Sequence, residues 1–394
     1  FKADYEKTLK RFEYLPQPKI TDVKLQVELY PKTRDYTLEG YYTLTNTLKE
    51  PIYKIYLQKP IGSEINLEEV SFEREAFADK QYNQYGFYIY TLKKALQAGE
   101  ALKMKFKQTY TTKGFKENDS NNSVLQNGTY LTNKTFPTLG YRKEYELDDT
   151  RIRGEFELPP AKGMAKRNDK TELTYADTGG NANLINFEVT IGTDKSQKAI
   201  SSGALQKEWT VDNRSYFHYK TDKPIVNQYA IISADYEVSK SKWFPKNDRL
   251  ATPVDLEIYY QKGHYYNVDR MTQAVKLSFD YFSTNFGSYQ HRNMRIIETP
   301  NYIEQAESFY GAIPFSESNE FMLNIDDQSD VDIILYRTAH ELAHQWWGMQ
   351  LQAANVQGKN MILETLAQYS ALMVMKKKYS KEKIEQLLQK EQAV

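Results

Sequence analysis

The sequence predicts a multi-domain protein of the β + α/β class, with a β-rich domain over residues 1–240 and an α/β domain over residues 241–394. Three observations support this prediction. Apolar and polar residues alternate in the first half, strand and helix patterns follow one another in the second half, and metal-ligating residue types gather between residues 340 and 364. With 394 residues and 40% apolar content, the chain is long enough to bury substantial cores.

Short strands separated by polar turns are predicted along the first half. Apolar residues alternate with Lys, Gln and Glu over residues 23–29, and similar runs recur at 36–44, 52–57, 87–92 and 102–110. We expect these strands to form an antiparallel β-sandwich or a curved, saddle-like sheet. Two polar stretches, 118–135 and 161–183, are predicted to be loops.

The second half begins after a Lys/Ser-rich segment, residues 235–247, where the alternating pattern ends and where we place the domain boundary. A strand is predicted over 254–260, a helix over 268–285 and another strand over 294–298. The helix prediction depends on apolar residues at helical spacing, which are Met271, Val275, Phe279 and Phe282.

The segment His340-Glu341-Leu342-Ala343-His344 has the residue types and the spacing of a metal site. A helix is predicted over 331–349, because apolar residues recur at helical spacing and no Pro or Gly occurs before Gly348. On a helix, two imidazoles four residues apart lie on one face and can hold one zinc ion. Glu341 beside them can reach a metal-bound water and act as a general base. The alternative is a helix whose histidines only cap or pack.

A third ligand must come from a second element, because one helix face cannot complete a tetrahedral site. Glu364 is the candidate, on a helix predicted over 360–375. Its apolar stripe is expected to pack against the first helix and consists of Ile362, Leu366, Tyr369 and Met373. The predicted ligands of one Zn²⁺ are therefore His340, His344 and Glu364, with Gln368 as a hydrogen-bonding partner behind them. The alternative for Glu364 is a solvated surface carboxylate.

The stretch from His340 to Gly348 resembles the metal-binding helix of the aminopeptidase N-type zinc metallopeptidases, which are gluzincins. Glu364 falls close to the glutamate ligand of that family. Nineteen residues separate it from His344, one more than is usual there and the same as in thermolysin. The order strand, helix, strand and two ligand-bearing helices also resembles a thermolysin-like catalytic domain. The resemblance implies zinc-dependent hydrolysis of peptide bonds by a zinc-activated water, with release of N-terminal residues.

Members of that family hold the free amine of the substrate with a Gly-Ala-Met-Glu-Asn segment upstream of the zinc helix. The corresponding region here is residues 305–317, in which Glu307 is the best match to the amine-binding glutamate and Ser308 replaces the Asn. Glu304 and Glu317 are alternative anchors, and an ordinary loop carboxylate is the alternative reading of Glu307.

Three segments, residues 15–23, 354–358 and 364–375, resemble the peptidase portion of bacterial proteins that fuse such a domain to an ABC-type permease. This resemblance implies a soluble fragment of a membrane-anchored bacterial protein, on the extracytoplasmic face and associated with membrane permease segments. It also gives a second hypothesis, a catalytically silent ectodomain that binds peptides or regulates a membrane transporter.

Composition and chain ends narrow the possibilities. Lys plus Arg equal Asp plus Glu at 52 each, which argues against nucleic acid as the main partner, and the lack of Cys excludes disulfides and thiolate ligands. The chain starts at Phe1 and stops shortly after a polar, helix-forming run, residues 379–388. We expect a fragment whose C-terminal helical domain is absent or truncated. The family's downstream tyrosine has no counterpart in Tyr369 or Tyr379, so low or no activity is expected.

Overall fold

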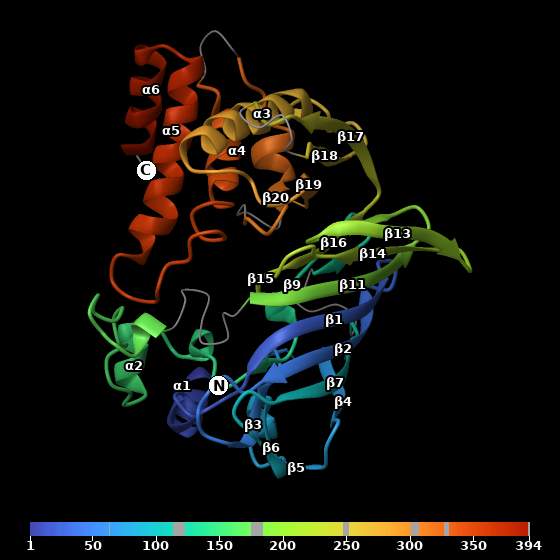
Figure 1. Ribbon diagram of the computed structural model, residues 1–394, viewed down its shortest axis with the longest axis vertical. Helices are drawn as coiled ribbons and strands as arrows, with labels where there is room; N and C mark the ends of the chain where they lie inside the picture. Colours follow the sequence, from blue (N-terminus) through green and yellow to red (C-terminus); the bar gives the residue numbers. More distant parts are fainter. Residues whose placement is uncertain are drawn as a thin grey trace.

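The computed structural model describes residues 1–62, 64–112, 123–174, 184–246, 252–300, 307–326 and 331–392. The described elements form layers along the long axis of the molecule (Figure 1). β-Sheets from the first half of the chain lie at one end, and helices from its last third lie at the other. Within the described residues, no helix is both long enough and apolar enough to cross a membrane.

The largest sheet among the described residues has eight strands. They are β1 (Lys19–Tyr30), β2 (Asp35–Thr45), β4 (Ile65–Phe72), β7 (Ala101–Tyr110), β11 (Leu184–Asp194), β13 (Ala204–Val211), β14 (Arg214–Lys220) and β15 (Ile225–Val226). The order is β13-β14-β11-β1-β2-β7-β4, with β15 paired to the end of β11. All neighbours are antiparallel except β1 and β11, which run parallel. The sheet is therefore mixed, rather than antiparallel throughout as predicted.

Two four-stranded sheets complete the first half. One contains β10 (Thr138–Leu139), β3 (Ile52–Gln58), β6 (Phe87–Leu96) and β5 (Ala76–Asp79), and the other contains β12 (Lys198–Ser201), β16 (Ala230–Ala234), β9 (Gly128–Thr132) and β8 (Val124–Leu125), each in that order. Two short helices, α1 (Lys2–Leu9) and α2 (Thr150–Glu155), lie beside them.

The predicted loop over residues 118–135 is wrong where it covers β8 and β9. Leu131 and Thr129 are fully buried, and β9 pairs with β16, which supplies hydrogen bonds that the polar composition of the segment does not reveal. Residues 118–122 lie outside the described residues. In the second predicted loop, residues 161–174 contain no strand, and residues 175–183 are outside the described part.

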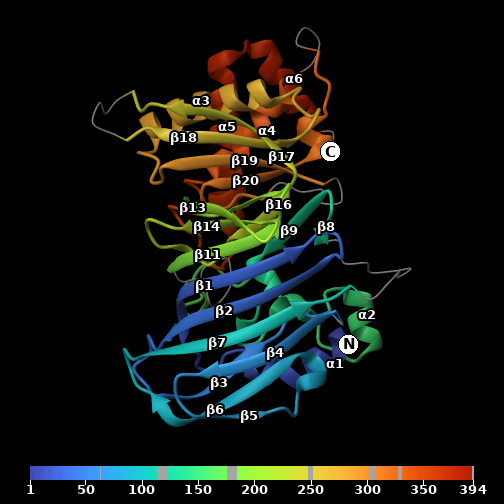
Figure 2. The same cartoon turned by 90° about the vertical axis from the view of Figure 1, so that its right-hand side faces the viewer.

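The second half contains a sheet covered by helices on one face. Its strands are β17 (Tyr236–Trp243), β18 (Val254–Gln261), β19 (Asn293–Thr299) and β20 (Ala312–Ser316), and its helices are α3 (Val268–Asn285), α4 (Ile333–Ala343), α5 (Leu366–Lys378) and α6 (Lys381–Gln392). The strand order is β17-β18-β19-β20, parallel from β18 onward. Figure 2 shows this sheet between the helices and the sheets of the first half. The predicted strands at 254–260 and 294–298 and the predicted helix at 268–285 are confirmed.

The prediction that the strand pattern ends in the Lys/Ser-rich segment at 235–247 is wrong, because this segment contains the edge strand β17. Its lysines point outward and pair across to β18, with Lys240 Nζ 3.2 Å from Glu257 and Lys242 Nζ 3.0 Å from Asp255. Charged side chains are typical of an edge strand, because they discourage pairing with other chains. The sheet of the second half therefore starts at Tyr236. The domain division at residue 240 stays a prediction.

A hydrophobic cluster joins the two halves of the chain. Its residues come from β12, β16, β17, β18, β19 and β20 and from the segment before β20, and they are Ile200, Ala230, Ile232, Ala234, Tyr236, Tyr259, Ile297, Phe309 and Ala312. Burial of these side chains packs the sheet of the second half against the sheet that contains β9 and β16. This packing fixes the position of both halves around the cavity described below.

Asp332 links the start of α4 to the end of α5 and to α3 through hydrogen bonds and ion pairs. It is 3% exposed, and its Oδ1 accepts a hydrogen bond from the Leu335 N–H (3.0 Å), which caps α4. Its Oδ2 accepts from Lys378 Nζ (3.2 Å) and the Tyr379 hydroxyl (2.7 Å) at the end of α5, and lies 3.2 Å from Arg270 on α3. Burial opposes ionisation of this carboxyl, but these donors outweigh it and hold the pKa of Asp332 below its ordinary value.

We predict that Asp332→Asn lowers the free energy of unfolding at pH 7 by about 1.5–3 kcal/mol, because it removes the charge that Arg270 and Lys378 pair with and weakens the hydrogen bonds that this buried carboxylate accepts. The folded-state pKa is lower than the unfolded one, so the stabilisation is present above about pH 4 and is lost as pH falls further. Urea denaturation at pH 7 and at decreasing pH should show the difference from wild type shrinking. Asp269→Asn, at an exposed position on α3, is the matched control. An equal change in the free energy of unfolding for the two substitutions would contradict the role of Asp332 in linking the helices.

Candidate metal and peptide site

His340 and His344 lie at the end of α4 and share one face of the helix. The helix ends at Ala343, not at residue 349 as predicted, and His344 is its C-cap with φ −61° and ψ −19°. Because these angles are still helical, both imidazoles keep the same orientation. After His344 the chain turns away, and Gly348 adopts φ +125°, a conformation that favours glycine.

Glu364 comes to the two histidines from a π-helical turn, η7 (Met361–Thr365), which precedes α5. Its Oε2 lies 3.4 Å from His340 Nε2 and 3.8 Å from His344 Nε2, and the two Nε2 atoms are 3.3 Å apart. Donors about 2.0–2.1 Å from a tetrahedral zinc ion must lie about 3.3–3.4 Å from one another. The three donors thus fit a zinc ion at their centre, and the sequence prediction that they come together agrees with this geometry.

A hydrogen bond of His344 selects the tautomer that can bind a metal ion. Its Nδ1 lies 3.1 Å from the Trp347 carbonyl oxygen, which can only accept, so Nδ1 carries the proton. In the neutral ring, Nε2 then presents a lone pair to the cluster. Burial and the neighbouring His340 lower the pKa of His344, which favours that neutral form. The hydrogen bond with His340 lowers the pKa of Glu364 and keeps it ionised.

Small residues make up most of the α5 face that packs into the core, together with Met375. Ala367, Ala371 and Val374 are buried, whereas Tyr369 of the predicted apolar stripe is 53% exposed, so the predicted stripe is wrong. Small side chains allow α4 and α5 to approach closely. Ser370 on the same face accepts a hydrogen bond from Trp347 Nε1 (2.9 Å), which ties the turn after α4 to α5.

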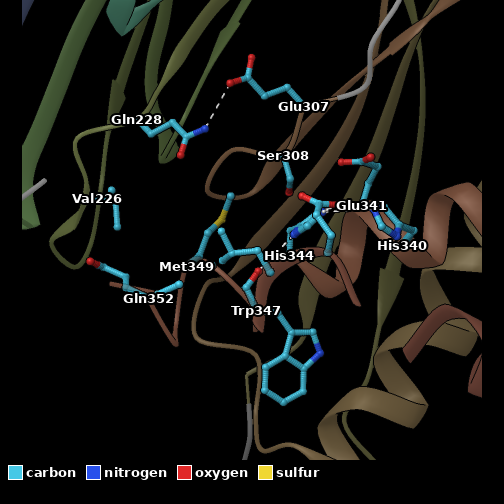
Figure 3. Close-up of a pocket in the computed structure, with 14 residues that line it drawn as sticks. Val226, Gln228, Glu307, Ser308, His340, Glu341, His344, Trp347, Met349 and Gln352 are labelled. Atoms are coloured by element: carbon cyan, nitrogen blue, oxygen red, sulfur yellow. Dashed lines mark hydrogen bonds and ion pairs between the residues drawn. The ribbon is translucent and has the colours of Figure 1, made fainter. Parts of the chain in front are cut away.

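A cavity of about 270 Å³ opens beside the ligand cluster (Figure 3). Its lining combines both halves of the chain and consists of Val226, Gln228, Glu307, Ser308, His340, Glu341, His344, Trp347, Gly348, Met349, Gln352, Ala353, Leu363 and Glu364. Glu341 lies next to the ligand cluster, and burial raises its pKa to about 7. Such a carboxylate can take up and release a proton near neutral pH.

Glu307 lines the same cavity and receives hydrogen bonds from the first half of the chain. The Tyr130 hydroxyl on β9 donates to its Oε2 (3.0 Å), and Gln228 Nε2, between β15 and β16, donates to its Oε1 (3.2 Å). Figure 3 shows Glu307 and Gln228 facing each other across the upper part of the cavity. Tyr130 and Gln228 could not be predicted from the sequence, because no local pattern marks residues that contact Glu307 only through tertiary packing.

Three further candidate residues came from the sequence: Glu304, Glu317 and Gln368. Glu304 is outside the described residues. Glu317 lies in a second cluster of potential metal ligands, together with His264 and Glu298. The Glu298 carboxylate already accepts hydrogen bonds from the Gln261 N–H (2.6 Å) and from His264. Gln368 is exposed on α5 and does not line the cavity, so its predicted contact with the ligands stays a prediction.

Comparisons by sequence find partial likeness to known enzymes. No family model matches the chain. Over 167 residues the chain is 27% identical to glutamyl aminopeptidase from Bos taurus, and over 165 residues it is 26% identical to the same enzyme from Sus scrofa. Each match covers 41% of this chain, which spans 17% of the length of these relatives.

Comparisons by structure extend over nearly the whole chain. The M1 zinc metallopeptidase from Deinococcus radiodurans matches with a TM-score of 0.60 at 13% identity, covering 92% of this chain and 72% of that one. Two mutant structures match with the same coverages, a two-domain M1 zinc metallopeptidase bound to L-tryptophan (TM-score 0.59, 13% identity) and one bound to a Tyr-Ser-Ala substrate (TM-score 0.58, 14% identity). At these identities the likeness establishes a shared fold, that of the two-domain M1 metallopeptidases.

We predict that the metal-stripped protein binds about one zinc ion per chain and unfolds at a higher temperature once loaded. His340→Ala and His344→Ala should each abolish both effects, measured by elemental analysis and by thermal unfolding. His218→Ala is the control, since His218 pairs with Glu188 on the first-half sheet. A wild-type protein without zinc affinity, or equal loss in the control, would contradict the ligand assignment.

Proposed function

We propose that this protein is a zinc-dependent peptidase of the aminopeptidase N-like M1 group and that it releases N-terminal residues from peptides. One observation carries the proposal. A three-donor cluster of zinc-like geometry, a carboxylate with a raised pKa and a second carboxylate, Glu307, share one cavity. The shared fold with M1 zinc metallopeptidases and the partial identity to glutamyl aminopeptidases support it.

His340, His344 and Glu364 would hold the zinc ion. Two imidazoles and one carboxylate would leave such an ion a net positive charge, with which it would polarise the scissile carbonyl and lower the pKa of a water molecule. Glu341 takes the proton from the attacking water and passes it to the leaving amine, a contribution of about 10²–10⁴-fold in rate. Burial supports this role, because it raises the proton affinity of Glu341 toward neutral pH.

Glu307 binds the free amine of the substrate. Its two oxygens each accept one hydrogen bond from an uncharged donor, Tyr130 or Gln228, and each keeps a lone pair for an ammonium group. A charge-assisted hydrogen bond to this carboxylate places the first residue of the peptide next to the ligand cluster. That arrangement supports the proposal that residues are released from the N-terminus.

Two further proposals, on the domain division and on the association with a membrane permease, depend on the sequence patterns and resemblances described above. We keep the division into a β-rich domain over residues 1–240 and a thermolysin-like catalytic domain over residues 241–394. We also keep the association with membrane permease segments on the extracytoplasmic face. Glu341 favours the enzyme over a silent ectodomain, because a site without turnover has no use for a general base.

We predict that Glu341→Gln retains one zinc ion per chain and reduces kcat by about 10²–10⁴-fold, because the amide cannot accept the proton. Peptide hydrolysis and elemental analysis on the same preparations measure both effects. Glu208→Gln, at an exposed position on β13, is the matched control. Undiminished hydrolysis by the Glu341 variant would exclude this residue as the base.

We also predict that peptides with a free amine are cleaved faster than the same peptides after N-acetylation. Glu307→Gln should raise KM for the free peptides by about 10–100-fold, the worth of a hydrogen bond to a charged group. Glu317→Gln tests the alternative anchor and should leave the discrimination unchanged. Equal cleavage of free and acetylated peptides by the wild type would exclude the amine anchor.

A further inference from the structure

We infer that the first half of the chain holds the turn that carries Glu364, and that Glu172 and Asn355 are positioning residues of the proposed metal site. Their role rests on the proposed function, in which Glu364 is the third zinc ligand. A polar segment of the first half, residues 161–174, contacts the loop that leads into η7, residues 353–360. Figure 1 shows this loop reaching from α5 to the part of the first half that contains α2.

The η7 turn has no buried residue of its own. The Glu364 side chain is 59% exposed, and Met361 at the start of the turn is 63% exposed. A metal site requires each donor within about 0.2 Å of its ideal distance. Since burial contributes little to holding this turn, its position depends on the two segments that flank it, which are α5 after the turn and the loop before it.

The loop before η7 is built from hydrogen-bonded turns. The Lys359 N–H donates to the Val356 carbonyl oxygen (3.1 Å), and the Met361 N–H donates to the Gly358 carbonyl oxygen (3.1 Å). Such turns leave the backbone between Val356 and Met361 little freedom. A contact that fixes Val356 therefore also limits the movement of the η7 turn, which begins at Met361.

Two contacts tether this loop to the polar segment. The backbone of Val356 lies beside that of Ala165 in a parallel bridge, and the Gln357 N–H donates to the Ala165 carbonyl oxygen (2.8 Å). Next to this bridge, Asn355 Nδ2 donates to Glu172 Oε2 (3.0 Å). A hydrogen bond to a carboxylate is stronger than one between uncharged groups, so the side-chain contact is the main tether.

Glu172 is in turn fixed to the first half of the chain. It is 8% exposed, whereas the other residues of the polar segment are exposed or half-buried. Its backbone N–H donates to Asp169 Oδ1 (3.1 Å), and its Oε1 lies 3.7 Å from Lys143 Nζ, which also pairs with Glu13 (2.9 Å). A buried carboxylate loses hydration and needs such partners in exchange. Glu172 therefore links the loop before η7 to the body of the first half.

Zinc affinity tests this positioning role, because the affinity of the folded protein depends on where Glu364 lies. Asn355→Ala and Glu172→Ala should each weaken zinc binding by about 10-fold, measured by competition with a chelator of known affinity. The double substitution should also cost about 10-fold rather than about 100-fold, since all three variants lose the same contact. Glu172→Gln keeps an acceptor oxygen for Asn355 and should stay within about 3-fold of the wild type.

Asn66→Ala and Glu69→Ala, at exposed positions on β4, are the matched controls and should leave zinc affinity unchanged. Circular dichroism of each variant establishes that it is folded, and the Asn355 variant decides alone if Glu172→Ala does not fold. Unchanged zinc affinity in Asn355→Ala, or an equal loss in the controls, would overturn the positioning role. Zinc binding by the wild type would leave the proposed function standing in that case.

Hydrogen exchange in the metal-free protein separates the positioning role from the proposed function. In Asn355→Ala, the amides of residues 354–366 should exchange about 10-fold faster than in the wild type, whereas those of residues 370–378 on α5 should keep their rates. This result supports the tether even if the wild type binds no zinc, in which case only the ligand assignment and the proposed function fail. Unchanged exchange over residues 354–366 overturns the positioning role.

Discussion

The close packing of α4 against α5 is the constraint on which the candidate site depends. The two histidines lie on one helix and Glu364 on the turn that leads into the other, so no metal-binding geometry exists until the two helices meet. The small side chains Ala367 and Ala371 allow the approach, and Asp332 fastens the far ends of both helices. At the near end, the Trp347 to Ser370 hydrogen bond holds the turn that carries the Trp347 carbonyl. That carbonyl in turn selects the tautomer of His344.

The carboxylates that line the cavity determine which ligands it can bind. Three carboxylates line the same cavity, and each has different surroundings. Hydrogen bonding to His340 keeps Glu364 ionised, burial raises the pKa of Glu341 to about 7, and uncharged donors from the first half of the chain hold Glu307. A zinc ion and a substrate ammonium are the cations that such a set would balance. In the proposed function, the β-rich half therefore supplies two hydrogen-bond donors to the amine-binding carboxylate.

Local patterns in the sequence predicted the parts of this structure that depend on neighbouring residues. The helix at 268–285 follows from its apolar spacing, and the clustering of the three candidate ligands follows from a fixed four-residue interval and one nearby carboxylate. The contact face of α5 and the partners of Glu307 depend on tertiary contacts and could not be predicted from local patterns. Tyr369 faces solvent because the contact face of α5 is formed by other residues, most of them small: Ala367, Ser370, Ala371, Val374 and Met375. The partners of Glu307 lie nearly 80 residues or more away in sequence, at Gln228 and Tyr130, where no pattern distinguishes them from ordinary strand residues.

The most direct test of this account is the position of zinc in a crystal of the loaded protein, measured by anomalous diffraction at the zinc absorption edge. The account predicts one peak among His340 Nε2, His344 Nε2 and Glu364 Oε2, at about 2.0–2.2 Å from each. A peak at the second cluster of His264, Glu298 and Glu317, or the absence of a peak at the α4–α5 contact, would contradict it.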